Sequence, residues 1–287
     1  MAELLKGAPV TAALNGETTA RASALRARGV APTLAILRVG ARDDDVAYEN
    51  GAVKRCGAVG VDVRRVTLPA DVPADDFYRT LDGLNRDDAV HGILMLRPLP
   101  AHIDGERARQ MLAVGKDVDG CTDGSLAGVF TRARVGFPPC TAEAVVAVLK
   151  HYGVGIAGSR AAVIGRSLVV GRPAAMLLLR DNATVTICHT GTRDLPAVVR
   201  EADIVVAASG KMESLGADCF RPGQTVVDVG ISWNGEKGKL CGDVRFDEAE
   251  PIVAAITPVP GGVGTVTSAL LAAHAVEAAE RAGDTSF

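Results

Sequence analysis

The chain has 287 residues, and at roughly 150 residues per domain this length predicts two domains. Hydrophobic residues make up 48% of it and charged residues 23%, a balance typical of globular proteins. A net charge of -3 without a basic cluster argues against a nucleic-acid partner. No apolar run approaches the ~18 residues of a membrane span and no signal-peptide pattern opens the chain, so we expect no membrane association and a cytoplasmic location.

The cysteines and histidines give no indication of a metal centre. The six cysteines lie far apart and form no Cys-x-x-Cys pair, which argues against both a zinc site and a disulfide framework. The five histidines include no His-Glu-x-x-His pattern. We therefore expect reduced thiols, mostly in the core, and no metal cofactor.

Apolar runs alternate with segments of helical periodicity along the chain, the pattern of parallel strands joined by helices. In the first half we expect strands at 33–40, 61–68 and 91–98, with connecting helices near 44–59 and 73–86. Loops rich in Pro, Gly and Asp follow the third strand. Because ligands of open α/β sheets bind beyond the carboxyl ends of the strands, these loops are candidates for a substrate site.

A second α/β series follows a helix that Thr141 is placed to cap, with Glu143 in its first turn. The last expected helix, about 266–282, comes after a glycine-rich segment, and we expect it to pack back on the first domain. No internal repeat or low-complexity tract interrupts the pattern. The expected strands of the second series are 161–165, 183–189, 202–209 and 225–231.

The first strand of the second series leads into a tight loop and a helix, the order of a dinucleotide-binding motif. The loop reads Gly165-Arg166-Ser167-Leu168-Val169-Val170-Gly171, in which a serine replaces the second glycine of Gly-x-Gly-x-x-Gly and the spacing is longer by one. Small residues here still let backbone amides and a helix N-terminus approach a pyrophosphate. A glycine turn that merely connects strand and helix is the alternative.

The end of the next strand distinguishes the two nicotinamide cofactors, because an acidic residue there binds the ribose hydroxyls of NAD and repels a 2′-phosphate. This chain has His189, Thr190 and Arg193 instead, with Arg166 in the phosphate loop. Such donors favour NADP and make NAD the weaker ligand. Arg193 is equally compatible with a solvated loop charge.

Seven segments have an order and spacing that are highly specific when taken together: "GRSLVVGRP" (165–173), "ATVTICHTGT" (183–192), "ADIVVAASGK" (202–211), "VVDVGI" (226–231), "KDVDG" (116–120), "PPCT" (138–141) and "TPVPGGVGTVT" (257–267). Over essentially its whole length, the chain resembles the family of bifunctional methylenetetrahydrofolate dehydrogenase/methenyltetrahydrofolate cyclohydrolases. The resemblance implies an α/β homodimer with an N-terminal folate-binding domain (1–142), a Rossmann-type NADP-binding domain (143–265) and a C-terminal helix (266–287) that returns to the first domain.

The resemblance also implies ligand-binding residues, carried over position by position. Tyr48 would stack on the aminobenzoyl ring of the folate and Asp119 would bind its pterin, so these two are the candidate catalytic residues. Without the surrounding pattern, Tyr48 is more typical of a partly buried helix aromatic than of a substrate contact, and Asp119 is typical of an Asp-Gly turn. The substrate would also contact Pro260, Gly261 and Gly262, and the cofactor would contact Gly165, Arg166, Ser167, Thr190 and Ile231.

Two positions depart from the family pattern. Members usually carry a lysine four residues after the tyrosine and a strand motif that ends Gln-Leu-Pro-Leu-Pro, whereas this chain has Ala52 and Leu96 at the lysine and glutamine positions. Lys54 does not replace the lysine, because a helix places it roughly 120° away from Tyr48. Strand alternation likewise predicts that Arg97 faces away from the side that Leu96 occupies.

The two departures affect one of the two family reactions. In the dehydrogenase reaction the hydride departs from a carbon flanked by two nitrogens, whose lone pairs stabilise the resulting cation. The protein therefore needs only to align substrate and cofactor. Hydrolysis requires water to lose a proton and a C–N bond to break with proton delivery. We therefore expect an NADP-dependent methylenetetrahydrofolate dehydrogenase of one-carbon metabolism with little cyclohydrolase activity. The alternatives are a full bifunctional enzyme, in which Gly51 and Gly57 distort the helix and bring Lys54 round, and a non-catalytic nucleotide-binding protein.

Overall fold

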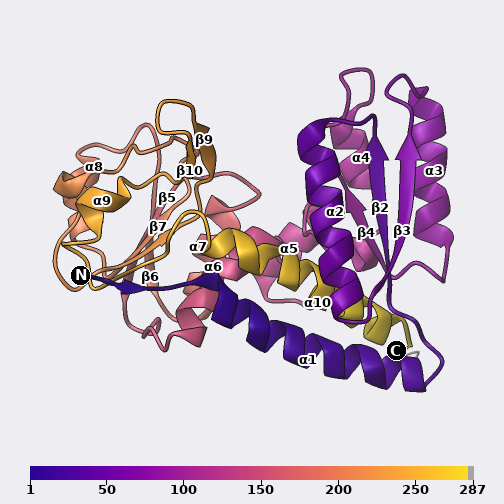
Figure 1. The fold of residues 1–287 in the computed structure, drawn as a ribbon, viewed down its shortest axis with the longest axis horizontal. Coiled ribbons are helices and arrows are strands. Elements are labelled where there is room, and N and C mark those ends of the chain that lie inside the picture. The colour runs from indigo at the N-terminus through magenta and orange to yellow at the C-terminus, as the bar shows by residue number, and fades with distance from the viewer. Residues whose placement is uncertain (284–287) are drawn as a thin grey trace. The chain divides into compact units, whose positions relative to one another are not determined.

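The computed structural model describes residues 1–283, and the chain forms two compact units. The six-stranded unit comprises Met1–Ala12 and Thr141–Thr267, and the three-stranded unit comprises Ala13–Cys140 and the residues from Ser268 onward. Helices α1 (Gly7–Ala27) and α10 (Val263–Gly283) each begin in the six-stranded unit and end in the three-stranded unit (Figure 1). Residues 1–12, expected with the first domain, lie in the six-stranded unit because β1 (Glu3–Leu4) pairs with β11 (Ala255–Ile256).

The three-stranded unit is built on a parallel sheet of order β3-β2-β4. Its strands are β2 (Thr33–Val39), β3 (Asp62–Leu68) and β4 (Gly92–Met95), and helices α2 (Asp43–Ala58) and α3 (Ala74–Arg86) connect them. These five elements confirm the expected ones, with β4 ending three residues early. The remaining elements of this unit are α4 (Gly105–Met111), the 3-10 helix η1 (Val114–Lys116) and α5 (Asp123–Thr131).

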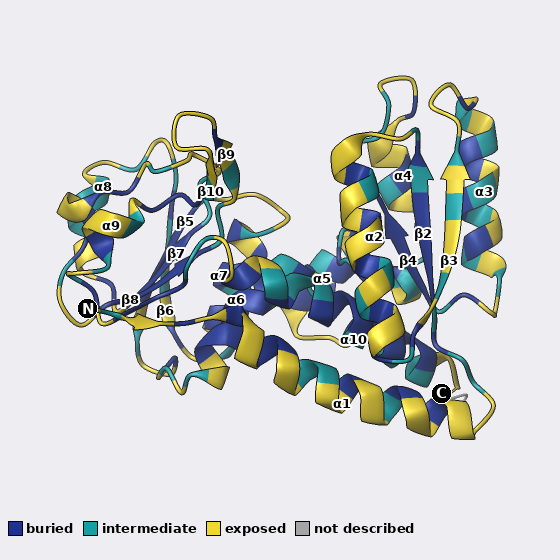
Figure 2. Cartoon of the chain, in the orientation of Figure 1, coloured by how far each residue is buried: buried dark blue, intermediate teal, exposed yellow. Residues whose placement is uncertain are grey.

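Two strands of this sheet, the central strand β2 and the edge strand β4, are buried on both faces. On one face, Leu37 and Met95 pack with Phe77 and Leu81 of α3 in a single apolar cluster. Alternation turns Leu34 and the other even-numbered residues of β2 toward the opposite face. Figure 2 shows the contrast with β3, whose residues are mostly exposed or half-buried at the sheet edge. The apolar runs of the sequence thus mark the two strands that are covered on both faces.

Helix α4 is fixed at its start by Asp104, whose carboxylate accepts the amides of Glu106 at 2.9 Å and Arg107 at 3.1 Å. We expect Asp104→Ala to lower the free energy of unfolding by about 1 kcal/mol, because two helical amides lose their acceptor. Urea denaturation at neutral pH measures it. Asp82→Ala, which removes an exposed carboxylate inside α3, should change stability by less than about 0.5 kcal/mol, and equal losses from both variants would contradict the capping role.

The six-stranded unit holds a fully parallel sheet of order β1-β11-β8-β7-β5-β6. Helix α6 begins at Cys140, directly after Pro139, so the expected cap Thr141 is wrong and lies inside the first turn. The other strands are β5 (Arg160–Ile164), β6 (Thr184–Cys188), β7 (Ile204–Ala207) and β8 (Thr225–Asp228), with β9 (Ser232–Asn234) and β10 (Lys239–Cys241) as a separate antiparallel pair. The helices are α6 (Cys140–His151), α7 (Gly171–Arg180), α8 (Leu195–Arg200), η2 (Ala217–Cys219) and α9 (Phe246–Ala249).

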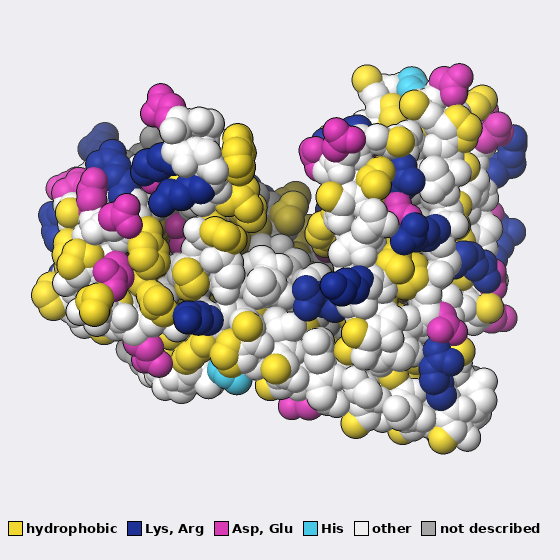
Figure 3. Space-filling model, viewed as in Figure 1, with side chains coloured by type: hydrophobic (Ala, Val, Ile, Leu, Met, Phe, Trp, Pro, Cys, Tyr) yellow, Lys and Arg dark blue, Asp and Glu magenta, His cyan; other side chains and the backbone are white. Residues whose placement is uncertain are grey.

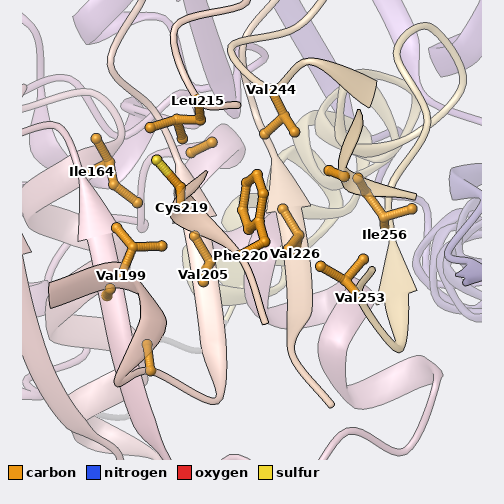
Figure 4. Close-up of a cluster of buried hydrophobic side chains, with 14 of the residues drawn as sticks. Ile164, Val199, Val205, Leu215, Cys219, Phe220, Val226, Val244, Val253 and Ile256 are labelled. Atoms are coloured by element: carbon orange, nitrogen blue, oxygen red, sulfur yellow. The ribbon is translucent and has the colours of Figure 1, made fainter. Parts of the chain in front are cut away.

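One face of this sheet carries a cluster of buried side chains, drawn in Figure 4. Val205, Val226 and Ile256 contribute from three neighbouring strands, and Val199 and Phe220 pack onto them. Because strand side chains alternate, their chain neighbours face the other side. Both faces are therefore apolar, as expected for a parallel sheet.

The surface carries charges of both signs. Lys and Arg side chains alternate with Asp and Glu over the visible face of each unit (Figure 3). Within residues 1–283, no helix is both long and apolar enough to cross a membrane.

Candidate active site

Tyr48 lies on α2, and its side chain remains 41% exposed although it is a large aromatic residue. The helix runs unbroken from Asp43 to Ala58, so Gly51 and Gly57 do not interrupt it. Four residues beyond Tyr48, Ala52 is 3% exposed, whereas Lys54 is exposed. The position one turn after Tyr48 is therefore apolar and buried, and Lys54 does not reach it.

Leu96 directly follows β4, and its amide still donates to the carbonyl of Leu37 at 3.0 Å. Its side chain is 7% exposed. Both positions where the sequence departs from the family pattern thus hold buried apolar groups.

The loop that carries Asp119 is held in place by its neighbour Asp117, which is fully buried. The Asp117 carboxylate accepts the amide of Cys121 at 3.0 Å, the amide of Thr122 at 2.7 Å and the hydroxyl of Ser125 at 2.6 Å. Gly120 follows with φ of +70°, and a Cβ there would lie 2.4 Å from the backbone nitrogen of Pro139. The structure thus contains the Asp-Gly turn, and this turn fixes the position of Asp119.

Asp119 lies in a partly desolvated, charged environment within the three-stranded unit. Its Oδ2 is 3.4 Å from Nη2 of Arg97, and the two side chains are 25% and 32% exposed. Burial raises the pKa of Asp119 to about 6, and the positive charge of Arg97 opposes that rise. Burial of the phenol, and then the negative charge of Asp119, raise the pKa of Tyr48. Tyr48, Asp119 and Arg97 therefore form one electrostatically coupled group.

In the six-stranded unit, the loop after β5 requires its two glycines. Gly165 has φ of +128°, and a Cβ there would lie 2.0 Å from the carbonyl oxygen of Ala208. A Cβ at Gly171 would lie 2.2 Å from the carbonyl oxygen of Gly165. The hydroxyl of Ser167 accepts the amides of Val170 at 3.1 Å and Gly171 at 3.4 Å, at the start of α7. Ser167 thus shapes the loop in addition to any ligand contact.

A pocket of about 320 Å³ opens beside this loop. Three of the predicted cofactor residues, Gly165, Arg166 and Thr190, line it together with His189. Ser209 and Lys211 also line it. Neither was predicted as a cofactor residue, although both belong to the "ADIVVAASGK" segment. The pocket wall therefore carries two cationic side chains and several hydroxyls.

Asp194, the acidic residue that follows β6, has a structural role. Asp194 caps α8, where its Oδ1 accepts the amide of Ala197 at 3.3 Å. Nδ1 of His189 accepts the amide of Gly191 at 3.0 Å, which places the ring hydrogen of the neutral imidazole on Nε2, as a donor. Between Cys188 and Asp194 the chain thus presents donors, in the place where an NAD site presents a carboxylate.

A second hollow in the six-stranded unit, of about 170 Å³, brings Ile231 beside Pro260, Gly261 and Gly262. Ile231 thus lines a different hollow from Gly165, Arg166 and Thr190, and it shares that hollow with residues predicted to contact the substrate. The loop before it is held by Asp228, a buried carboxylate that accepts backbone amides from Gly230, Asp243 and Val244 at 2.9 to 3.0 Å. Burial raises the pKa of Asp228 to about 7, and these donors oppose the rise.

The geometry of the first pocket fits a dinucleotide phosphate. Glycines whose Cβ positions are filled by backbone let the chain pass close to a ligand, and α7 begins at the loop that would hold a pyrophosphate. Arg166 and Lys211 supply positive charge. No cluster of acidic, histidine or cysteine side chains suited to a metal ion occurs among residues 1–283.

Two family models match the chain: the catalytic domain of tetrahydrofolate dehydrogenase/cyclohydrolase over residues 5–119, and the NAD(P)-binding domain of the same family over residues 139–283. The chain belongs to the tetrahydrofolate dehydrogenase/cyclohydrolase family. It is similar to the bifunctional protein FolD of Carboxydothermus hydrogenoformans, with 50% identity over 98% of both chains.

Solved structures of tetrahydrofolate dehydrogenase/cyclohydrolases have the same fold. The bifunctional FolD of Campylobacter jejuni is 36% identical, with a TM-score of 0.94 over 98% of this chain and 99% of that one. The FolD of Trypanosoma brucei, complexed with NADP cofactor and an inhibitor, is 35% identical, with a TM-score of 0.91 over 99% of both chains. The two family domains fall on the two halves of the chain in which the site residues were found.

Proposed function

We propose that this chain is an NADP-dependent methylenetetrahydrofolate dehydrogenase with little cyclohydrolase activity. The observation that carries the proposal is that one chain of this family combines a glycine-bounded, cationic pocket with a Tyr48–Asp119 site whose water-activating positions are apolar. A protein that merely bound nucleotide would have no use for the second site. The Carboxydothermus relative is named a bifunctional protein, so full bifunctionality is the competing proposal.

The loop after β5 and the pocket beside it have different roles in holding the cofactor. Gly165 and Gly171 bring backbone amides to the pyrophosphate, and Ser167 keeps their loop in shape. Arg166 and Thr190 are the donors for a 2′-phosphate, since Asp194 is occupied at the start of α8. When bound, NADP supplies the acceptor for the hydride. We propose a further contact at Ile231, which is 61% exposed at the second hollow.

The proposed folate contacts are an aromatic ring, a carboxylate and backbone groups. Tyr48 presents an exposed ring face for stacking on the aminobenzoyl group, and the carboxylate of Asp119 accepts N–H donors of the pterin. Pro260, Gly261 and Gly262 contribute backbone without bulky side chains. The carbon that loses hydride lies between two nitrogens that stabilise the cation, so these residues need only align it.

Hydrolysis of the methenyl product requires groups that move protons, and the two positions where the family pattern has a lysine and a glutamine lack such groups in this chain. Ala52 and Leu96 are both buried and apolar. A lysine and a glutamine at these positions would hold and activate a water.

Separate assays of the two half-reactions on the purified protein test the proposal. Reduction of NADP with methylenetetrahydrofolate should be robust. Hydrolysis of the methenyl compound should run little faster than in protein-free buffer. Strong hydrolysis would favour the bifunctional proposal, and absence of both activities would favour the nucleotide-binding one.

Two variants separate the role of the Tyr48 ring from that of its hydroxyl. Tyr48→Ala should raise KM for methylenetetrahydrofolate by about tenfold, because a stacked aromatic ring contributes about 1 to 1.5 kcal/mol. Tyr48→Phe keeps the ring and should stay within about threefold of the parent enzyme. Steady-state kinetics at saturating NADP measure both, and equal losses in the two variants would assign the function to the hydroxyl.

The remaining parts of the proposal concern organisation. We propose that residues 1–142 act as the folate-binding domain, 143–265 as the NADP-binding domain, and 266–287 as a segment that completes the first. We also propose a homodimer and a cytoplasmic location. Analytical ultracentrifugation and cell fractionation test these two.

A further inference from the structure

Arg97 lies beside the predicted pterin residue Asp119, and its position in the sequence departs from the family pattern. Where the family pattern reads Gln-Leu, this chain reads Leu96-Arg97. The polar side chain is thus shifted by one residue along the chain. Because β4 ends at Met95, strand alternation does not fix the direction of Arg97, and its Nη2 lies 3.4 Å from Oδ2 of Asp119.

This contact differs from an ordinary surface ion pair. Arg86 and Asp82 on α3 are 2.9 Å apart, but their side chains are 79% and 44% exposed, so solvent screens them. Arg97 and Asp119 are 32% and 25% exposed. A charge beside a carboxylate that has lost part of its hydration acts more strongly on that carboxylate than one in open solvent.

Several other groups act on Asp119, and they shift its pKa in opposite directions. Burial raises its pKa most, and the neighbouring carboxylate of Asp117 adds to the rise. His274 on α10 acts in the same direction as Arg97 and lowers the pKa. The negative charge of Asp119 in turn raises the pKa values of two neighbours, Tyr48 on α2 and Cys121 in the loop.

We propose that Arg97 is a positioning residue of the folate site, whose guanidinium keeps the Asp119 carboxylate ionised and fixed in direction for the N–H donors of the pterin. An ionised carboxylate has about four acceptor positions, so one contact with Arg97 leaves the others for the ligand. Arginine suits the role because it stays charged at every working pH. The inference rests on the proposed function, since it takes the ligand of Asp119 to be a pterin.

The test follows KM for methylenetetrahydrofolate from pH 5.5 to 8.5 at saturating NADP. In the parent enzyme, KM should rise as Asp119 takes up a proton near pH 6. In Arg97→Leu we expect that midpoint to move up by about one pH unit, which raises KM about fivefold at pH 6. At pH 8.5, where Asp119 is ionised in both enzymes, only the smaller, pH-independent rise in KM from the lost orientation of the carboxylate should remain. Arg97→Lys should restore most of the midpoint, while kcat and KM for NADP should change less than about twofold.

Arg86→Leu is the matched control, since it removes an arginine from an exposed pair in the same unit. It should leave the pH profile unchanged. A rise in KM that is equal at all pH values, or an unchanged midpoint in Arg97→Leu, would overturn the proposal.

A second readout does not depend on activity. In protein labelled with ¹³C at aspartate carboxyls, the titration midpoint of Asp119 should be higher in Arg97→Leu than in the parent, and Arg97→Lys should reverse most of the change. An unaltered midpoint would refute the role of Arg97. If the parent protein instead lacked dehydrogenase activity, the proposed function would fail while this titration still decided the effect of Arg97.

Discussion

The double variant Ala52→Lys with Leu96→Gln should hydrolyse the methenyl compound at least about tenfold faster than the parent protein, because positioned acid–base groups contribute factors of about 10² to 10⁴. Each single variant should gain much less. A glutamine alone at the 7%-exposed position 96 loses its hydration without a partner, at a cost of about 1 to 3 kcal/mol. A lysine alone at the 3%-exposed position 52 has no group to direct it.

Hydrolysis is followed spectroscopically against protein-free buffer, and NADP reduction in the same preparations reports whether the folate site is intact. Lys54→Ala is the control, because Lys54 is exposed on α2 and should contribute nothing. A fold-gain in the double variant equal to the product of the two single fold-gains would show that the two side chains act independently. Robust hydrolysis by the parent protein that disappears in Lys54→Ala would contradict the geometry of α2.

The features that follow from local sequence were predictable. A strand, a glycine loop and a helix in immediate succession define the phosphate loop, and the structure gives a steric reason for each glycine. The directions of Ala52 and Lys54 follow from helix geometry, since α2 is regular. The buried central strands followed from their apolar runs.

Features that depend on pairing between distant segments were not predictable. A two-residue strand such as β1 has no periodicity, so its pairing with β11 left no signal in the sequence. Asp228 and Asp243 hold loops together through backbone amides, which any sequence would offer. The contact between Arg97 and Asp119 arises beyond the end of β4, where alternation no longer determines direction.

Arg166→Ala should weaken NADP binding by about 1.5 to 3 kcal/mol, or roughly tenfold to a hundredfold in Kd, and leave NAD binding nearly unchanged. Arg166 lines the pocket with Thr190, and the acid that would favour NAD is replaced by donors, with Asp194 engaged at α8. Because Arg166 is exposed, the loss should lie toward the lower end at physiological salt and grow as salt is reduced.

Titration of both cofactors at two salt concentrations measures the selectivity of the pocket directly. Arg166→Lys retains the charge and should recover part of the affinity, but not all, since an ammonium lacks the bidentate geometry of a guanidinium. Arg193→Ala is the matched control: it removes an exposed arginine of the same neighbourhood that does not line the pocket, and it should cost less than about 0.5 kcal/mol. Equal losses of NADP and NAD in Arg166→Ala would show that Arg166 contacts the shared pyrophosphate, because both cofactors carry that group and only NADP carries the 2′-phosphate.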